Sequence, residues 1–426
     1  MGLVKRAAEG LVNKYIWHKI SFVKKSRELL VSDSTLRDGE QTPGVSLLPD
    51  EKVRIAGLLA EMGVDSIDAA FAGAGGSEVE ALKRITNYFG KSRDMPRVTS
   101  LCRAVESDID AAFEGLRLAG VSKRGVSIFI GTSPEHMKFK FRDASKERII
   151  DRAVKAICYA RSKGFAMISF SPEDASRTEP EFLTEIYEAV IDAGAVNIGF
   201  TDTVGEMTPF ETFFKINYIA ENVFNFRKAT FAIHFHNDLD LATANSLTAI
   251  ETGKVDIFQG TIGGIGERSG NAPLESVVMA LKLKPQIYGM TTRIDISKIG
   301  PTADEVYKLI GVEIPDTKPI IGRNIFRTEA GIHQAGLMAG PETYEIFPPS
   351  EVGRQGRELW IGKHSGRHAV YDCLAKNGYG GSQRIFDEFK EMAGRQKGVG
   401  ERELLEIAEM QKGVGERELL EIVERG

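Results

Sequence analysis

Two histidines stand two positions apart in the stretch "FAIHFHNDLD", residues 231–240, and an amide and two carboxylates follow them. If this apolar run is a β-strand, the side chains of His234 and His236 project from the same face, because successive side chains of a strand alternate. Two imidazoles on one face can hold a metal ion. They can equally be two core or surface histidines that happen to alternate, so the metal interpretation needs further ligands.

Further candidate ligands follow two other strand-like runs, one in "DSTLRDGEQTPG" near the start of the chain and one at the end of "GGIGERSGN". The candidate ligands are Asp38, His234, His236 and Asn271. This mixed oxygen and nitrogen set suits Zn²⁺, Mn²⁺, Mg²⁺ or Fe²⁺ and lacks the thiolates that would select zinc. It also leaves coordination positions open for substrate or water, which is typical of a catalytic metal site.

Eight short apolar runs recur along the chain and would position these side chains. They begin near residues 29, 64, 97, 125, 164, 195, 230 and 257. Between them lie stretches such as "PDEKVRIAGLLAEMG", whose apolar residues recur at the three- and four-residue intervals of amphipathic helices. Eight strand–helix units over about 250 residues predict an α/β fold of the (β/α)₈ TIM-barrel type. A doubly wound open sheet has similar periodicity.

We favour the barrel because polar clusters follow several of the eight strands, and in a barrel all those strand ends meet at one mouth. The first strand alone would bring four polar side chains there: Arg37, Asp38, Glu40 and Gln41. A charged surface loop is the alternative interpretation of that stretch.

The domain organisation changes after about residue 290, where the regular rhythm ends. We predict a basic N-terminal extension over 1–28, a catalytic barrel over 29–290, a smaller α-rich subdomain over 291–395 and a duplicated helical tail over 396–426. In that tail "QKGVGERELLEI" occurs twice, and each copy is predicted to open at a glycine-containing turn and continue as a helix.

Composition narrows the function classes. A net charge of −5 gives no electrostatic case for a nucleic-acid partner. The three cysteines are an odd and widely spaced set, which suggests neither a disulfide framework nor a zinc knuckle, so we expect a reducing, cytoplasmic location. No apolar run approaches the ~20 residues that span a bilayer, and the basic first 28 residues lack the apolar core of a secretory signal. We therefore expect no membrane partner.

Seven separated motifs, in chain order, resemble those of the 2-isopropylmalate synthase and homocitrate synthase family. They are "DSTLRDGEQTPGVSL", "FSPEDASR", "TDTVG", "HFHNDLDLATANSL", "GGIGERSGNAPLESVVMAL", "GIHQ" and "GKHSGRH". The resemblance covers about residues 29–395 and implies a TIM-barrel metalloenzyme, an acyltransferase that joins acetyl-CoA to a 2-oxo acid and then hydrolyses the thioester. It also implies that the two histidines are ligands of a divalent Mg²⁺, Mn²⁺ or Zn²⁺ ion.

The resemblance implies roles for further residues at the mouth. Arg37, beside the ligand Asp38, would add a second positive charge at the keto oxygen of the oxo acid during attack. Glu173 corresponds to an active-site glutamate of the family, and a rim salt bridge is the alternative interpretation of it. The expected substrate-binding residues are Arg37, Gln41, Asp68, Arg103 and Thr203.

The base that removes a proton from the acetyl methyl group is expected on the appended segment. His333 in "EAGIHQ" matches the family's candidate, with Glu329 four residues earlier to orient it if that stretch is helical, and with Tyr344 as a possible assistant. In the family this segment commonly reaches the partner subunit's mouth, so a homodimer is expected. Gly264 and Gly266 would permit close approach of the backbone to CoA.

One position departs from the family pattern. The chain has "IDAAF" where the family usually has a pattern like "IEAG", so Asp68 is one methylene shorter than the usual glutamate. The stretches "CRAVES" and "GTSPEHMKFKF" lack the charges that homocitrate synthases use for the far carboxylate of 2-oxoglutarate. An uncharged tail, as in 2-oxoisovalerate and leucine biosynthesis, therefore fits better, because an unpaired buried carboxylate is costly.

Alternatives remain open. Homocitrate synthase acting on 2-oxoglutarate and citramalate synthase acting on pyruvate share several of the motifs. A carbon–carbon lyase of the same superfamily would share the barrel and the metal ligands but not the His333 segment. A non-catalytic metal-binding regulator would tolerate the loss of Arg37 and His333, and both are present.

Overall fold

The computed structural model describes residues 26–90 and 95–424, with side chains described as far as residue 412. Most of the predicted N-terminal extension lies outside the described residues. The chain divides into two compact units, Met1–Ile314 and Pro315–Gly426, and each is described by itself.

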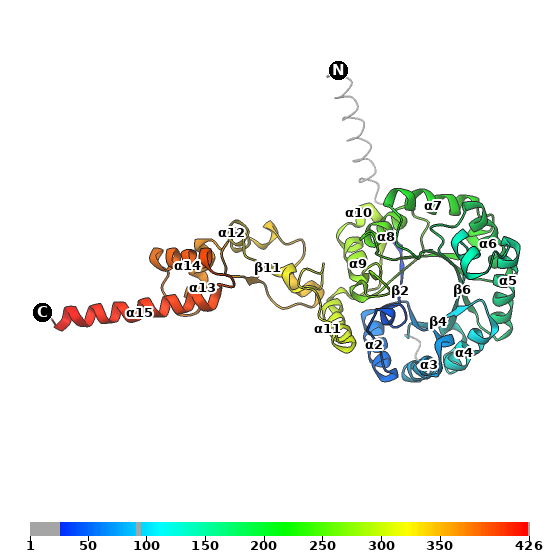
Figure 1. Cartoon of the computed structure of the whole chain (residues 1–426), viewed down its shortest axis with the longest axis horizontal. Helices are drawn as coiled ribbons and strands as arrows, with labels where there is room; N and C mark the ends of the chain where they lie inside the picture. The colour runs from blue at the N-terminus through cyan, green and yellow to red at the C-terminus, as the bar shows by residue number, and fades with distance from the viewer. Residues whose placement is uncertain (1–25, 91–94, 425–426) are drawn as a thin grey trace, which may run out of the picture. The chain divides into compact units, whose positions relative to one another are not determined.

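The first unit is a closed barrel of parallel strands that neighbour one another in chain order (Figure 1). The strands are β2 (Leu30–Asp33), β3 (Ser66–Ala70), β4 (Arg97–Arg103), β5 (Arg124–Gly131), β6 (Met167–Glu173), β7 (Asn197–Asp202), β8 (Thr230–Phe235) and β9 (Ile257–Gly260). Hydrogen bonding between β2 and β9 closes the barrel, with Leu30 opposite Ile257. Each strand overlaps one of the eight predicted runs, so the TIM-barrel prediction is confirmed.

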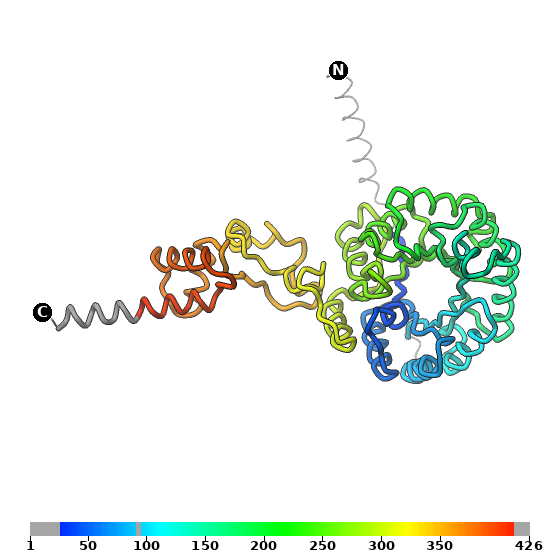
Figure 2. Tube along the Cα trace, in the orientation of Figure 1, coloured from blue at the N-terminus to red at the C-terminus, as the bar shows by residue number. Residues whose placement is uncertain are grey.

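Helices surround the barrel, and the chain runs once around it from β2 to α9 (Figure 2). They are α2 (Pro49–Met62), α3 (Gly76–Phe89), α4 (Glu106–Leu116), α5 (Lys146–Ser162), α6 (Pro180–Ala193), α7 (Pro209–Asn222), α8 (Ala242–Glu251) and α9 (Leu274–Leu283), followed by the short α10 (Pro285–Tyr288). Local sequence sets several starts. Before α7 the Thr208 hydroxyl accepts from the Glu211 amide while the Glu211 carboxylate accepts from the Thr208 amide, which satisfies two free donors at the helix start.

The barrel unit extends further than predicted. The predicted boundary after residue 290 falls before α11 (Ile299–Ile310), which packs on α2 and is tied to it by an ion pair of 2.7 Å between Glu305 and Arg54. A two-stranded pairing of β1 (Arg27–Glu28) with β10 (Met290–Thr291) also joins the beginning of the described chain to this stretch. The compact unit that holds the barrel therefore runs to Ile314, whereas the sequence analysis places the end of the catalytic barrel at residue 290, and the domain bounds stay a prediction.

The strands bury one face under the helices and leave the other around a cavity. In β6 the outward-pointing Ile168 and Phe170 are completely or almost completely buried, whereas the inward-pointing Ser169 and Ser171 are only half-buried. Most TIM barrels fill this interior with large branched side chains. Small polar residues at these inward positions leave room for a site below the strand ends.

The second unit is helix-rich, as predicted. It contains α12 (Gly331–Ala339), α13 (Arg367–Lys376), α14 (Gln383–Arg395), α15 (Glu401–Glu424) and the paired strands β11 (Arg327–Thr328) and β12 (Glu358–Leu359). Helices α13 to α15 share a small core of their own, which includes Val370, Leu374, Phe389, Leu404 and Ile407.

The repeated tail differs from its prediction. Helix α15 begins at Glu401, after the glycines of the first copy, and continues without a break through the second copy, so the glycine turn expected before the second copy is helical. Glycine inside a helix lowers its stability by about 1 kcal/mol without breaking the backbone hydrogen bonds. The first copy also packs, because its Leu404 and Ile407 are buried in the core of the unit.

Two further sequence-based expectations concern the cysteines and the membrane. Cys102, Cys158 and Cys373 are all free, and Cys158 is exposed. Within the described residues no helix is long and apolar enough to cross a membrane.

Candidate active site

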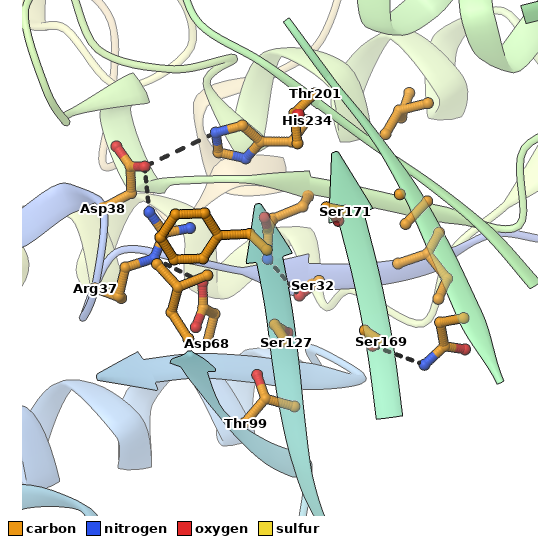
Figure 3. Close-up of a pocket in the computed structure, with 18 of the residues that line it drawn as sticks. Ser32, Arg37, Asp38, Asp68, Thr99, Ser127, Ser169, Ser171, Thr201 and His234 are labelled. Atoms are coloured by element: carbon orange, nitrogen blue, oxygen red, sulfur yellow. Dashed lines mark hydrogen bonds and ion pairs between the residues drawn. The ribbon is translucent and has the colours of Figure 1, made fainter. Parts of the chain in front are cut away.

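Three side chains from two strand ends converge at the mouth of the barrel. Asp38 Oδ2 lies 3.8 Å from His234 Nε2 (Figure 3). It lies 3.9 Å from His236 Nε2, and the two Nε2 atoms are 3.4 Å apart. Strand β8 ends at Phe235, yet His236 keeps the direction of His234 because it forms an isolated bridge with Asn271. All four predicted ligands are buried. The short distance between the two Nε2 atoms shows that the two histidines share a face, as predicted.

The chemistry of this cluster fits a divalent cation. Burial lowers the pKa of His234 to about 3 and also lowers the pKa of His236, so both rings are neutral and can offer a lone pair. Burial opposes ionisation of Asp38, but Arg37, the two neighbouring histidines and the hydrogen bond from Asn271 together more than offset it and hold that pKa below its usual range. One carboxylate and two neutral imidazoles, with donor atoms within 4.8 Å of one another, form a ligand set that Mg²⁺, Mn²⁺ or Zn²⁺ accepts.

Asn271 completes the cluster. Its Nδ2 donates to Asp38 Oδ1 at 2.8 Å and to the Ile265 carbonyl at 3.0 Å. Its Oδ1 is buried and has no hydrogen-bond partner among the described residues. A buried, unsatisfied amide oxygen beside a carboxylate and two imidazoles is free to act as a further metal ligand.

The two glycines expected at the CoA site have a different structural reason to be glycine. A Cβ atom on Gly266 would lie 2.2 Å from Asn271 Nδ2 and 2.7 Å from Asp38 Oδ1, and the backbone there has φ of 154°. A Cβ atom on Gly264 would lie 2.7 Å from the Asn271 carbonyl oxygen. Both glycines therefore let the loop after β9 pack against the ligands, and their contact with CoA stays a prediction.

Arg37 joins the metal cluster to Asp68. Its Nη1 donates to Asp38 Oδ2 at 2.5 Å and its Nε donates to Asp68 Oδ2 at 2.8 Å (Figure 3). Burial alone would lower the pKa of Arg37, but the two carboxylates raise it, so the guanidinium stays charged. The shorter side chain at position 68 therefore still reaches Arg37, with additional support from the Ser34 hydroxyl at 2.9 Å.

Buried contacts hold the loop that carries Asp38. Asp33 accepts from the Thr35 amide at 2.8 Å and from its hydroxyl at 2.9 Å, which fixes the turn after β2. Lys52, completely buried in α2, pairs with Glu40 at 2.6 Å and with Glu78 at 2.8 Å. Because a lone buried ammonium would be costly, these contacts restrict where Glu40 and its neighbours can lie.

A cavity of about 380 Å³ leads from this cluster into the barrel. The predicted site residues that line it are Arg37, Asp38, Gln41, Asp68, Glu173, Thr203, His234 and His236. Arg103 does not line it. Its guanidinium is paired with Asp108 at 2.8 Å and its side chain is 54% exposed, because β4 ends there and the chain turns outward into α4. A substrate contact by Arg103 has no support from this geometry.

Glu173 stands at the cavity mouth with partners that the sequence-based prediction missed. Its Oε2 is 2.6 Å from Lys140 Nζ and its Oε1 is 3.6 Å from His136 Nε2. These partners hold the pKa of Glu173 below its usual range although burial opposes this. His136 also contacts Asp174 at 3.2 Å, and its hydrogen bonds to Asp174 and Glu173 raise its pKa to about 9. The available signal was the "SPEH" stretch just after β5 and the "SPED" stretch at the end of β6.

Thr203 is oriented by the backbone of the neighbouring strand end. Its Oγ1 accepts from the Asp174 amide at 2.8 Å. The hydroxyl proton of Thr203 is then free to donate elsewhere, and Thr203 lines the cavity. This suits the predicted hydrogen bond to a substrate carboxylate.

The second unit holds the remaining predicted residues. The rings of His333 and Tyr344 stack with centres 4.2 Å apart, and both side chains are exposed. Glu329 lies before α12, which begins at Gly331, so the helical spacing that would let it orient His333 is absent. Its Oε1 instead accepts from the His364 amide at 3.1 Å.

The sequence matches two family models in succession. Residues 28–306 match the HMGL-like family, and residues 320–397 match the "homocitrate synthase post-HMGL domain-like" family. The first match lies within the first compact unit and the second match lies within the second unit. A short stretch between the two matches belongs to neither.

Curated relatives and solved structures extend these matches. The chain is 45% identical to a 2-isopropylmalate synthase of Pyrococcus furiosus over 89% of this chain and 75% of the relative, and 42% identical to one of Geobacillus sp. over 89% and 73%. Among solved structures it resembles an HMG-CoA lyase of Bacillus subtilis, with TM-score 0.58 and 19% identity over 68% of this chain and 97% of that one. This last likeness shows the fold alone. By the family match and these identities, the chain belongs to the HMGL-like family and is a homologue of the 2-isopropylmalate synthases.

Proposed function

We propose that this chain is an acyltransferase that condenses acetyl-CoA with 2-oxoisovalerate and hydrolyses the thioester, releasing CoA and 2-isopropylmalate. The observation that carries the proposal is the buried Asp38–His234–His236 cluster with Arg37 beside it, in a chain 45% identical to a named 2-isopropylmalate synthase. The second family match supports a synthase over a lyase, because it covers the segment that holds His333.

The barrel residues bind and polarise the oxo acid. A divalent cation held by Asp38, His234, His236 and Asn271 would supply Lewis-acid chemistry at the keto group when bound. The guanidinium of Arg37, kept charged by Asp68, supplies positive charge where the keto oxygen becomes an alkoxide. Thr203, whose hydroxyl proton is free, donates to the carboxylate of the oxo acid.

Proton transfer needs a base that is not a metal ligand. His333 is exposed and lies outside the Asp38–His234–His236 cluster, and it takes the proton of the acetyl methyl group in this proposal, while the stacked Tyr344 orients its ring. In the same proposal Glu173, held ionised by Lys140 and His136, accepts a proton from the water that hydrolyses the thioester.

A homodimer in the cytoplasm completes the proposal. The second unit exposes apolar side chains around His333, with Ile332 81% and Ile346 75% exposed, which suits a face that is covered in an assembly. Free cysteines, one of them exposed, suit a reducing compartment. Mixing inactive Arg37→Gln protein with inactive His333→Ala protein tests the shared site, because restored turnover requires residues from two chains at one mouth.

The deciding experiment follows CoA release from acetyl-CoA with a thiol reagent. Pyruvate, 2-oxoisovalerate, 2-oxoglutarate and no oxo acid are offered in parallel with Mn²⁺ or Mg²⁺. Turnover with 2-oxoisovalerate, abolished by a chelator and restored by metal, supports the proposal. Turnover with a different oxo acid would make that acid the substrate in place of 2-oxoisovalerate. If no oxo acid gives CoA release, the synthase activity itself is contradicted.

A further inference from the structure

The segment between β5 and α5 has an unusual backbone. Residues 136–142, with sequence HMKFKFR, are called the cationic segment below. His136–Lys140 forms a π-helix, and Arg142 and Asp143 follow with φ of 55° and 60°. π-Helices are rare and often lie at functional sites, and left-handed conformations of residues other than glycine are strained. The π-helix and the two left-handed residues that follow it both cost conformational free energy. Such a strained backbone is typical of a loop that binds a ligand.

The side chains of the cationic segment form a surface suited to a nucleotide. Lys138, Phe139, Lys140 and Arg142 are all exposed, and Phe139 is 76% exposed. Lys138 Nζ lies 5.0 Å from the centre of the Phe139 ring. An exposed aromatic ring flanked by cations provides a stacking face for a base and charges for phosphate groups.

This surface borders the cavity of the active site. Lys140 Nζ is 2.6 Å from Glu173 Oε2 and 5.7 Å from the centre of the Phe129 ring. Glu173 and Phe129 both line the cavity. A ligand whose reactive end enters the cavity can therefore lay its other end on the cationic segment.

Most other cations near the strand ends are already engaged by carboxylates. The pairs are Arg37 with Asp38 and Asp68, Arg103 with Asp108, Arg177 with Asp174, and Arg268 with Asp238. Lys138 and Arg142, in contrast, have no ion pair or side-chain hydrogen bond with any residue that the structure describes. Two exposed cations that stabilise no carboxylate are available for an anionic ligand.

We propose that Lys138, Phe139 and Arg142 bind the adenine nucleotide portion of the acyl-CoA substrate, with the cations on its phosphates and Phe139 against its adenine. This inference rests on the proposed function, because acetyl-CoA is the nucleotide-bearing substrate of that reaction. It assigns a binding role to a segment outside the metal cluster and outside the glycine loop after β9.

The test compares two acetyl donors. Acetyl-CoA carries the nucleotide, and the acetyl thioester of N-acetylcysteamine lacks it. In the double variant Lys138→Ala/Arg142→Ala, the KM for acetyl-CoA rises about tenfold, as expected for two exposed phosphate contacts. The readout is the ratio of kcat/KM for acetyl-CoA to kcat/KM for the short thioester, which falls by the same factor. Lys155→Ala, an exposed residue of α5 paired with Asp151, is the matched control.

Two further measurements sharpen the assignment. Raising the ionic strength increases the KM for acetyl-CoA more in the native protein than in the double variant, because salt screens exposed charges. Phe139→Ala raises the same KM, and Phe139→Trp restores it, if the ring stacks on adenine. Acetyl-dephospho-CoA lacks the 3′-phosphate and keeps the diphosphate. If a cation contacts only the 3′-phosphate, its substitution no longer changes the KM for this donor.

Direct binding keeps this inference separate from the proposed function. Titration calorimetry measures the Kd of CoA itself on the metal-loaded protein, with or without turnover. A Kd about tenfold weaker in the double variant supports the cationic segment even if no oxo acid reacts. An unchanged Kd, or an unchanged ratio between the two acetyl donors, overturns it whatever the enzyme's substrate is.

Discussion

Asp38, His234 and His236 in the barrel are buried and directed at one another, whereas His333 in the second unit is exposed and stacks on the ring of Tyr344. Both regions carry histidines, but burial gives them different properties. In the barrel it lowers the pKa of His234 to about 3 and keeps the ring neutral. An exposed histidine keeps access to protons and to a mobile substrate.

Under the proposed function, this difference divides the work between the two units. The barrel holds its site preorganised, because Arg37, Asp68 and Asn271 already bind the ligand Asp38 or its neighbours. The second unit presents its histidine on α12 among exposed apolar side chains. We therefore expect barrel substitutions to change metal and oxo-acid binding, and substitutions near His333 to change turnover alone.

The largest expected effect tests this division in the second unit. His333→Gln lowers kcat by about 10²–10⁴-fold, because a positioned base contributes that much to proton transfer. The affinity for Mn²⁺, measured by calorimetry, stays at the native value. A His333→Gln protein that lost metal binding as well would contradict the separation between the two regions.

In the barrel, Arg37→Gln is expected to lower kcat/KM for the oxo acid by about 10²–10³-fold, the usual effect of losing one donor to a developing oxyanion. It also leaves Asp68 without its ion pair. Steady-state kinetics measures the first effect and urea unfolding the second. Arg54→Gln, which removes a surface ion pair with Glu305, is a control of the same chemical type.

A smaller effect is expected from the loop after β9. Gly266→Ala pushes a Cβ atom against Asn271 and Asp38 and lowers Mn²⁺ affinity by about 10–100-fold, as displaced ligand partners do. The matched control is Gly76→Ala, because a Cβ atom there meets no atom within 4 Å. Equal metal affinity in the two variants would show that the loop adapts and does not hold the ligands.

The smallest effect concerns pH. Hydrogen bonds to Asp174 and Glu173 raise the folded-state pKa of His136 to about 9, above the unfolded value of 6.5. The stability this adds is fully present below pH 6.5 and is lost as the pH rises through about 9. Between pH 7 and 10 the native protein should lose about 1 kcal/mol more unfolding free energy than His136→Gln. His368→Gln, an exposed histidine of the second unit, should lose as much as the native protein.

The sequence by itself determined the barrel and most of the Asp38–His234–His236–Asn271 cluster. Eight apolar runs alternated with amphipathic helices, and alternation along β8 placed His234 and His236 on one face. Chemical type then selected Asp38 and Asn271, since each follows a strand whose end opens at the same mouth. These are local patterns, which a sequence carries directly.

Only the tertiary structure decided the contacts between segments far apart in the chain. Sequence reasoning could not tell that Arg103 turns to Asp108, or that Gly266 makes room for Asn271 and Asp38. It could not see that α11 packs on α2 and moves the end of the barrel unit to Ile314. Such contacts depend on strand register and on the room left by neighbouring side chains, and neither quantity is periodic along the sequence.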